Sequence, residues 1–425
     1  MTRTRPLMSA PPPTQRSRAH AWQRPALHAL PLAACAYAVL IPLQPILTLP
    51  DGSPLRLAGS DLVAPFVFLA ALVRPRRRLP LGLAALAVAI VLLAVVSTLL
   101  AASDRPLSGY TIGKTLGLVY LVGLSFALVR STDAGAEASI LRALAWGALW
   151  SAIVGLGGFA AWWLAGIQTT LVSGPRVCST MPGDPNIFCS VLAVGLLTTA
   201  MDRRSSIAGR AVRSAILIVA IFASGSRSGA GAAAVAIGAA LFLRHRDAWV
   251  TAARAGVVVL ALTVAATPLL LTKPGARTAD MLREHVWRTF TINSRLDLYA
   301  EAWEEFRDNP VSGLGIGGFR ELHIWTEGGR REQLPVHNTY LWAFVDMGVG
   351  GGLLLIGLIT GAVWRCARAA VQRPAANGAA VVAAGLLAMA TFNLFIDGFY
   401  QRHFWVLVAC ALGIQTRMGA TRTVA

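Results

Sequence analysis

Charged side chains are scarce in this chain of 425 residues: they make up 14% of it, whereas hydrophobic residues make up 55%. Acidic residues are the rarer sign, with 20 Asp and Glu against 38 Lys and Arg. A soluble domain of this length needs more polar side chains to cover its surface. The composition therefore excludes a soluble globular protein and predicts an all-α polytopic membrane protein.

Metal-binding motifs are also missing. The five cysteines show no CxxC or Cys/His spacing, and no cluster of carboxylates or histidines suggests a divalent cation. The sequence therefore predicts no metal site and no cofactor. We expect buried free thiols, with a disulfide between Cys178 and Cys189 as an alternative because both could lie near the outer face.

Hydrophobic stretches that could cross a membrane, at roughly 20 residues each, recur along the chain. We count about twelve, of which the sixth, seventh, eighth and twelfth are short and rich in Gly and Ala. Re-entrant segments are the main source of error in such a count. The stretches are 27–49, 57–73, 79–100, 111–129, 141–167, 186–200, 211–223, 228–243, 252–271, 336–364, 378–395 and 403–414.

Arginines are concentrated in every second loop, and this distribution indicates the orientation of the chain in the membrane. Short cytoplasmic loops hold an excess of Lys and Arg, and a cytoplasmic N-terminus collects on one side the arginines of 74–78, 203–213 and 365–373. This phase predicts that both termini are cytoplasmic. The same loop arginines explain the net charge of +18, which we interpret as contact with anionic lipid rather than nucleic acid.

One polar segment interrupts the hydrophobic stretches and must lie outside. The predicted organisation is a disordered cytoplasmic tail in 1–26, transmembrane helices 1–9 in 27–272, a partly helical periplasmic loop domain in 273–335, transmembrane helices 10–12 in 336–417, and a second cytoplasmic tail in 418–425.

The polar segment contains an amphipathic pattern. Leu296, Tyr299, Trp303 and Phe306 recur at spacings of three and four, which predicts a helix lying against the membrane domain. A glycine run at 313–318 follows, but it lacks the Lys-Ser/Thr of a P-loop and the preceding strand of a dinucleotide site. The run alone is weak evidence for nucleotide binding.

Two arginines stand on the sparsely charged outer side. Arg227 lies in a short turn of small residues before a predicted helix, where a guanidinium and backbone N–H groups favour phosphate. The alternative is an arginine that extends to the interface. Arg176 precedes an Asp184-Pro185 pair, which we interpret as the start of a helix.

His337 opens the hydrophobic stretch after the polar segment. A lone histidine is more often packed than catalytic, but an ordinary pKa near 6.5 suits proton transfer or a contact to phosphate. The neighbouring Asn338 can orient a ligand.

Several motifs follow one another in a fixed order within residues 183–364. They are GDPN at 183–186, SGSRSG at 224–229, Arg295 and Leu296 leading through Trp303 and Phe306 to Asn309 and Pro310, GLGIG at 313–317, HNTYL at 337–341, and Asp346 with Met347 and Gly348. This combination resembles the O-antigen ligase and polymerase superfamily, in which Glu is common where Asp346 stands.

The resemblance implies a GT-C-like architecture and a metal-independent, inverting glycosyltransferase. Such an enzyme moves a glycan from undecaprenyl diphosphate to an acceptor hydroxyl in the periplasm, and the acceptor is lipid A core, another lipid-linked glycan or a protein. By the resemblance, Arg227 and loop arginines such as Arg288 and Arg295 bind the diphosphate, and Arg176 is a further candidate. His337 acts as general base or contacts the diphosphate.

The chemistry of a lipid diphosphate agrees with these residue types. The diphosphate is already an activated leaving group, so the enzyme must neutralise negative charge, orient the acceptor and remove one proton. Arginines do the first without a metal. Two other classes remain open: a transporter or flippase, which predicts charged residues in mid-span, and a noncatalytic membrane scaffold.

Overall fold

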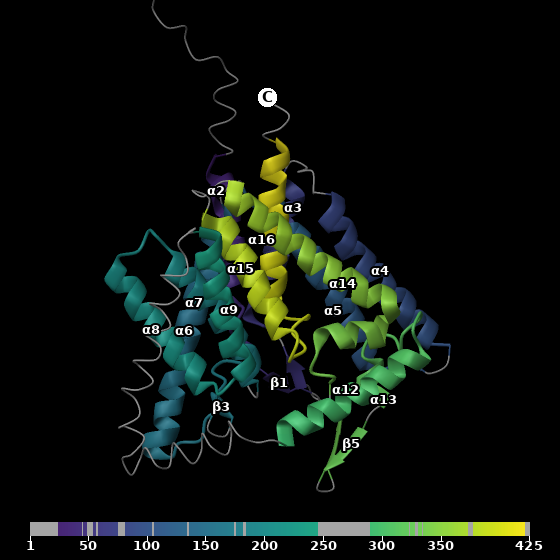
Figure 1. Ribbon diagram of the computed structural model, residues 1–425. Helices are drawn as coiled ribbons and strands as arrows, with labels where there is room; N and C mark the ends of the chain where they lie inside the picture. The colour runs from purple at the N-terminus through teal and green to yellow at the C-terminus, as the bar shows by residue number, and fades with distance from the viewer. Residues whose placement is uncertain are drawn as a thin grey trace, which may run out of the picture.

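The chain folds into a bundle of helices that run between two ends of the molecule (Figure 1). The computed structural model describes residues 24–44, 46–48, 54–56, 58–74, 81–103, 106–133, 136–173, 176–181, 184–244, 290–322, 324–327, 330–333, 335–372 and 377–420. The predicted ninth hydrophobic stretch and Arg288 lie outside the described residues, as do residues 1–23 and 421–425 of the predicted tails.

Helices account for most of the described residues. They are α2 Arg24–Leu40, α3 Gly59–Val73, α4 Leu81–Ala101, α5 Gly109–Ser131, α6 Ala136–Ala165, α7 Pro185–Met201, α8 Ile207–Ala223, α9 Arg227–Arg244, α12 Phe290–Asp308, α13 Gly318–Leu322, α14 Thr339–Gln372, α15 Asn377–Phe392 and α16 Arg402–Ala420.

Each predicted hydrophobic stretch within the described residues overlaps one of these helices, which confirms the all-α membrane class. Among the helices that the structure describes, four are long and apolar enough to cross a membrane: α4, α5, α6 and α14. The total of twelve spans and the GT-C-like architecture remain predictions. The first stretch was predicted to reach residue 49, but α2 ends at Leu40, because Pro42 and Pro45 cannot continue a helix.

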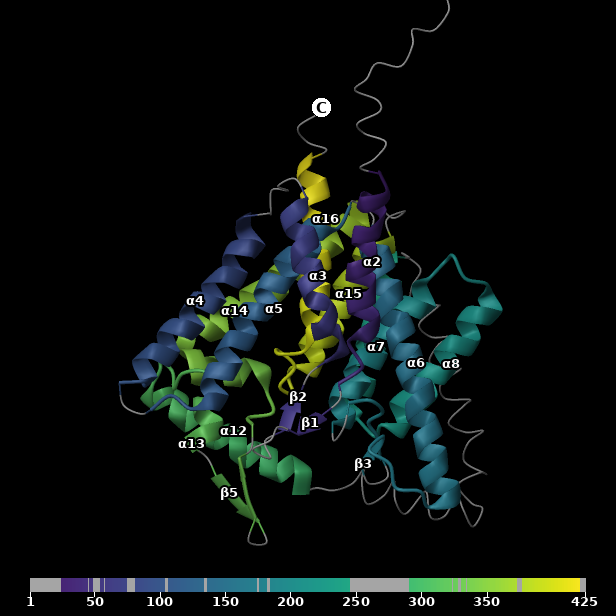
Figure 2. The ribbon, with the colours of Figure 1, turned by 180° about the vertical axis from the view of Figure 1, so that it is seen from behind.

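Three short antiparallel hairpins lie at one end of the bundle together with α12 and α13 (Figure 2). We call this the hairpin end. The hairpins pair β1 Ile46–Thr48 with β2 Pro54–Arg56, β3 Val172–Ser173 with β4 Arg176–Val177, and β5 Ile324–Glu327 with β6 Arg330–Gln333. The hydrophobic pattern did not predict them.

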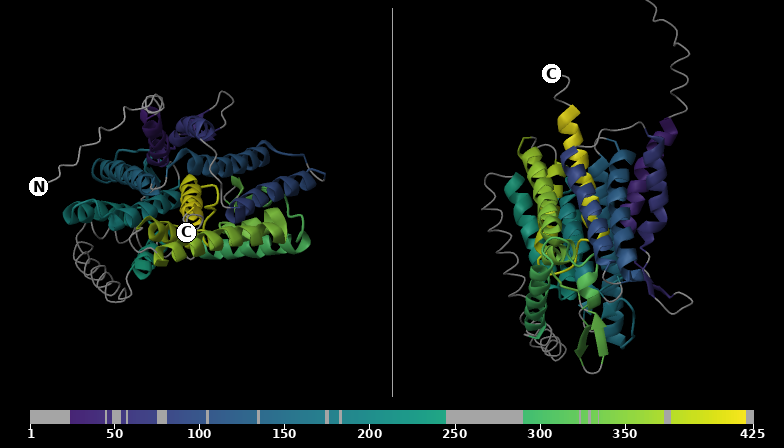
Figure 3. Two further views of the ribbon diagram at one scale, coloured as in Figure 1. Left: turned by 90° about the horizontal axis from the view of Figure 1, so that it is seen from above. Right: turned by 90° about the vertical axis from the view of Figure 1, so that its right-hand side faces the viewer.

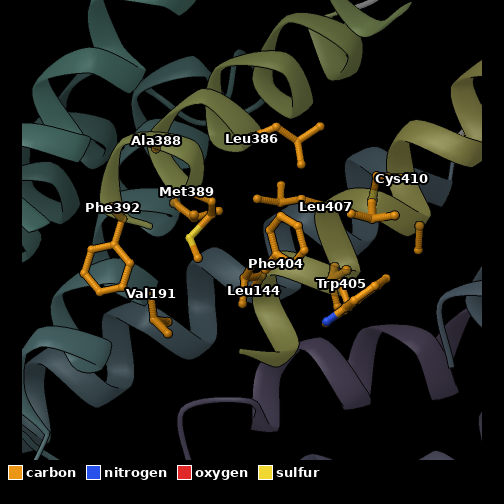
Figure 4. Packing of buried hydrophobic residues seen from close by; sticks show 14 of the residues in the cluster. Leu144, Val191, Leu386, Ala388, Met389, Phe392, Phe404, Trp405, Leu407 and Cys410 are labelled. Carbon is orange, nitrogen blue, oxygen red and sulfur yellow. The ribbon is translucent and has the colours of Figure 1, made fainter. Parts of the chain in front are cut away.

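Helix α2 begins and α16 ends at the opposite end of the molecule, so the chain enters and leaves the bundle on one side (Figure 1). Helix α16 lies at the centre, where it contacts α5, α14 and α15 (Figure 3). Apolar side chains of α6, α7, α15 and α16 fill the space around it, among them Leu144, Val191, Met389 and Phe404 (Figure 4). This apolar packing holds in place the helices that lead to the hairpin end.

The longest helix, α14, is broken at Gly348. Its φ of 68° and ψ of −172° belong to a region that essentially only glycine adopts. At the break the Val349 N–H donates to the Pro310 carbonyl at 2.8 Å, and a Cβ on Gly348 would collide with the Val311 carbonyl oxygen. The chain after α12 is thereby attached to α14 through its backbone.

Asp346 reinforces this attachment. Its carboxylate is fully buried and accepts hydrogen bonds from the N–H groups of Gly317 at 2.6 Å and Phe319 at 3.3 Å. The Ser97 hydroxyl of α4 donates to the Asp346 carbonyl at 2.6 Å. The glycine run therefore wraps around a carboxylate of the same chain, and these N–H groups do not face a phosphate.

Helix α12 is the predicted amphipathic helix, but its buried face differs from the predicted stripe. Leu298 and Ala302 are buried, whereas Leu296 and Trp303 are 57% and 49% exposed. Successive helix positions turn by about 100°, so Leu296 and Leu298 point to nearly opposite sides. The prediction that this stripe is buried is confirmed for Phe306, which packs edge-on against a ring of α14. It is wrong for Leu296 and Trp303.

The cysteines are free thiols, and Cys178 and Cys189 are both buried. The alternative of a disulfide between them is therefore wrong. Their thiols belong to the packing near the hairpin end.

We expect Gly348→Ala to lower the free energy of unfolding by about 1–3 kcal/mol, because alanine must adopt a strained backbone conformation against the Val311 carbonyl. Thermal unfolding of the detergent-solubilised protein measures this. Gly357→Ala on the same helix is the control, since its added methyl meets only Leu86 at an ordinary 3.9 Å. Equal melting temperatures for the two variants would contradict the strained break.

Candidate functional site

His337 lies in the link between β6 and α14 at the hairpin end. Its φ of 55° falls in the left-handed region, which few residues other than glycine adopt. The Tyr299 hydroxyl of α12 donates to the His337 carbonyl at 3.1 Å and so helps to hold this conformation. An enforced rare conformation at a polar position is a feature of functional sites.

Asn338 forms the start of α14. Its side-chain oxygen accepts hydrogen bonds from the N–H groups of Tyr340 at 3.0 Å and Leu341 at 3.1 Å, as an N-cap does. This oxygen is committed to the helix. The predicted role of Asn338 in orienting a ligand has a simpler structural explanation and remains a prediction.

Arg176 is held in place by the turn between α8 and α9. Its Nε donates to the Ser224 carbonyl at 2.8 Å, and its Nη2 donates to the Asn186 side chain at 2.8 Å. Asp184 caps α7 by accepting from the Ile187 N–H at 2.9 Å, which confirms the predicted helix start. Two fixed hydrogen bonds orient the Arg176 guanidinium.

Arg227 is the first residue of α9, directly after that turn. The turn requires small residues: Gly225 has a φ of 62° with Arg176 beside it, and a Cβ on Gly229 would collide with the Cys189 thiol. The Ser226 hydroxyl accepts from the Gly229 N–H at 3.2 Å and caps α9. The exposed Arg227 side chain therefore starts from a tightly defined backbone.

Arg295 of α12 connects these groups electrostatically. Burial lowers the pKa of the Arg295 guanidinium, and the positive charge of Arg227 acts in the same direction. Burial is also the main cause that lowers the pKa values of Arg176 and His337. The Arg295 charge is a smaller cause that lowers both pKa values further. Contacts bring these residues together in two pairs: Arg176 donates to the Ser224 carbonyl, three residues before Arg227, and Arg295 stands about one helical turn before Tyr299, whose hydroxyl bonds to the His337 carbonyl. The effect of the Arg227 charge on Arg295 links the two pairs, and we interpret the four residues as one candidate site.

The site favours anions and a neutral imidazole. Arginine stays protonated despite a lowered pKa, and the Asp184 carboxylate only partly offsets the charge on Arg176. Burial lowers the pKa of His337 to about 4. At neutral pH this imidazole is therefore uncharged and can accept a proton.

The sequence missed the side chains that position these residues. Tyr299 was assigned to an apolar stripe, although its hydroxyl bonds to the His337 backbone. Asn186 was read only as part of a helix start, although it accepts a hydrogen bond from Arg176. No local signal reveals either contact, because the partners lie on other elements. Arg288 lies outside the described residues, so its predicted contact is untested.

Within the described part of the chain, no three His, Cys, Asp or Glu side chains gather as a metal site. The charges that this site offers an anion come from guanidinium groups.

Fold and site together define a helical membrane protein with a cationic centre at one end of its bundle. Residues 213–356 match the family model of O-antigen ligase, and no curated protein matches the chain. The matched segment covers about a third of the chain and supports the resemblance to the O-antigen ligase and polymerase superfamily that the motifs suggested, and with it a role in polysaccharide biosynthesis as a ligase or polymerase. The match includes Arg227, Arg295 and His337, whereas Arg176 lies before it.

We expect His337 to make the protein less stable as the pH falls from about 6.5 to about 4. Its pKa is about 4 in the fold and about 6.5 when unfolded, so the unfolded chain binds the proton more readily in this window. The full shift corresponds to about 3 kcal/mol. Melting temperatures of wild type and His337→Gln in detergent across this window test it, because other titrating groups are the same in both proteins.

His337→Gln should lose less stability than the wild type on acidification. Parallel curves for the two proteins would show that His337 titrates normally in the fold.

Proposed function

We propose that the chain is an inner-membrane glycosyltransferase that moves a glycan from undecaprenyl diphosphate to an acceptor hydroxyl on the periplasmic face. The proposal is supported by two contacts at the hairpin end, in which Arg176 is held by the turn that precedes Arg227, and His337 is held by Tyr299 of the helix that carries Arg295, and by the low pKa of the buried His337 imidazole. This arrangement suits a reaction in which a diphosphate leaves and one proton must be removed.

The arginines would act on the donor. Guanidinium groups pair with phosphate oxygens through two parallel hydrogen bonds, and the fixed orientation of Arg176 supports such pairing. As the bond between the anomeric carbon and the diphosphate breaks, negative charge grows on the leaving oxygen. Nearby guanidinium groups would stabilise this charge without a metal ion. Arg288 is a further candidate for the same role.

His337 would act on the acceptor. Its uncharged imidazole takes the proton of the acceptor hydroxyl as that oxygen attacks the anomeric carbon from the side opposite the diphosphate. Attack from that side inverts the configuration of the sugar. A bound diphosphate places negative charge near His337 and raises the pKa of the imidazole from its low value, which strengthens it as a base.

Ligase and polymerase activities share this donor chemistry and differ in the acceptor. The acceptor is lipid A core for a ligase, a second lipid-linked repeat for a polymerase, and a serine or threonine hydroxyl for a protein-glycosylating relative. Loss of a one-step shift of lipid A on a gel indicates a ligase, whereas loss of chain length indicates a polymerase.

We expect His337→Ala and Arg295→Ala to abolish surface polysaccharide in a strain that lacks the gene, while lipid-linked precursor accumulates. Removing a general base costs about 10²–10⁴ in rate, and removing one stabilising charge costs about 10²–10³. Gels of surface polysaccharide and assays of the precursor, at matched membrane abundance, measure both effects.

Arg307→Ala is the control, because Arg307 lies on the same helix as Arg295 with an exposed side chain. It should support normal polysaccharide. Normal polysaccharide from all three variants would favour a transporter or scaffold over a transferase.

A further inference from the structure

A second polar cluster lies at the hairpin end, formed by α5, α13 and the segment that joins α15 to α16. The Lys114 ammonium of α5 lies 3.8 Å from the Asp397 carboxylate and 4.0 Å from the centre of the Tyr400 ring. On its other side is the Tyr110 ring, which Arg320 of α13 also covers at 4.6 Å. The mechanism above uses none of these side chains.

Two polar atoms in this cluster have no hydrogen-bond partner among the described residues: Asp397 Oδ1 and the Tyr400 hydroxyl. Leaving such atoms buried and unsatisfied destabilises a fold. An ion pair at 3.8 Å with both side chains partly exposed stabilises a fold only weakly. The two unsatisfied atoms lie on neighbouring side chains beside one weak ion pair, so a single ligand could bond to both.

The cluster is anchored to the segment that carries His337. The Thr339 hydroxyl, two residues after His337, donates to the Ile396 carbonyl at 2.8 Å and accepts from the Gly398 N–H at 2.9 Å. The Trp342 ring of α14 meets the Tyr400 ring edge-on at 5.7 Å. Positions of the cluster and of His337 are therefore coupled through direct contacts.

The cluster lies on a different side of this segment from Arg176 and Arg227. Arg176 and Arg227 belong to β4 and α9, whereas Lys114 and Arg320 belong to α5 and α13. In Figure 1 the link between α15 and α16 turns between these two groups of elements. Inversion requires the acceptor to approach from the side opposite the leaving diphosphate, so the cluster stands where an acceptor would be held.

We propose that Lys114, Asp397 and Tyr400 form a binding site for the hydroxyl-rich saccharide of the acceptor. This inference rests on the proposed function and adds to it the residues that hold the second substrate. A sugar hydroxyl both donates and accepts hydrogen bonds, and the site offers it an unsatisfied carboxylate oxygen, a phenol and an ammonium group.

The phenol is suited to donate. Burial and the negative charge of Asp397 raise the pKa of Tyr400 well above its ordinary value, so the hydroxyl stays protonated. Asp397 can only accept while it is ionised. Together they select a ligand that carries both kinds of hydrogen-bonding atom, as a saccharide does.

The test is steady-state kinetics of the full-length enzyme with an undecaprenyl-diphosphate-linked glycan as donor. Lipid A core is the acceptor in one arm, and a second lipid-linked repeat is the acceptor in the other. We expect Tyr400→Phe to raise the KM for the acceptor about three- to tenfold, the loss of one hydrogen bond, and to leave the KM for the donor unchanged. The arm that shows transfer identifies the source of the saccharide.

Tyr37→Phe is the control, because the Tyr37 hydroxyl of α2 is buried next to the side chains of Ser60 and Tyr120 and does not belong to the cluster. It should leave both KM values unchanged. A second variant, Lys114→Met, should raise the KM for the acceptor more than Tyr400→Phe does. It also removes the partner of Asp397 and can affect folding, whereas Tyr400→Phe changes only one unsatisfied atom.

An unchanged acceptor KM in Tyr400→Phe overturns the inference, as does an equal rise in donor KM, which would assign the cluster to the donor or to the fold. Failure of the proposed function gives a different result: the wild type transfers nothing in either arm.

Discussion

The contact between the glycine run and the break in α14 is the constraint on which the site depends. Asp346 accepts N–H groups from Gly317 and Phe319, and the backbone at Gly348 approaches that of residues 310–311 too closely for any side chain. These bonds fix where α12 ends relative to where α14 begins. Helix α12 carries Arg295, and the link before α14 carries His337. The same contact therefore sets the distance between the Arg295 guanidinium and the His337 imidazole, which is the candidate base.

The sequence predicted the helices well because each depends on its own composition. A long apolar run must form a helix in a membrane, since lipid offers its backbone no hydrogen bonds, and Asp184 followed by Pro185 marks a helix start locally. The hairpins and the buried face of α12 could not be predicted in this way. Both depend on contacts with other parts of the chain. In α12, for example, a neighbouring element covers Leu298 rather than Leu296, and the spacing of apolar residues in the sequence allows either one to be buried.

The candidate site, like the fold, could be predicted from the sequence only in part. Arg176 and Arg227 could be selected because arginine is unusual on a sparsely charged face of a membrane protein. Arg295 was selected from the resemblance of its motif to a known family, and His337 from its place after the polar segment and from the same resemblance. The supporting contacts of Arg176 and His337 come from residues far away in the chain. Asp346 was noted only as a departure from the family's usual Glu, yet its shorter side chain binds the glycine run directly. Its role follows from geometry that no motif encodes.

The electrostatics of the site give a physical reason for ordered chemistry. Burial and, to a smaller extent, the Arg295 charge lower the pKa of His337, so its imidazole is uncharged and weakly basic. In the proposed mechanism, a diphosphate anion bound to the arginines would offset the positive charge that weakens the imidazole, so His337 would become a stronger base when the donor is bound. The arginines that would bind the leaving group would therefore also control the group that activates the acceptor hydroxyl. An acceptor that arrived before the donor would meet a weaker base, which would limit unproductive proton transfer.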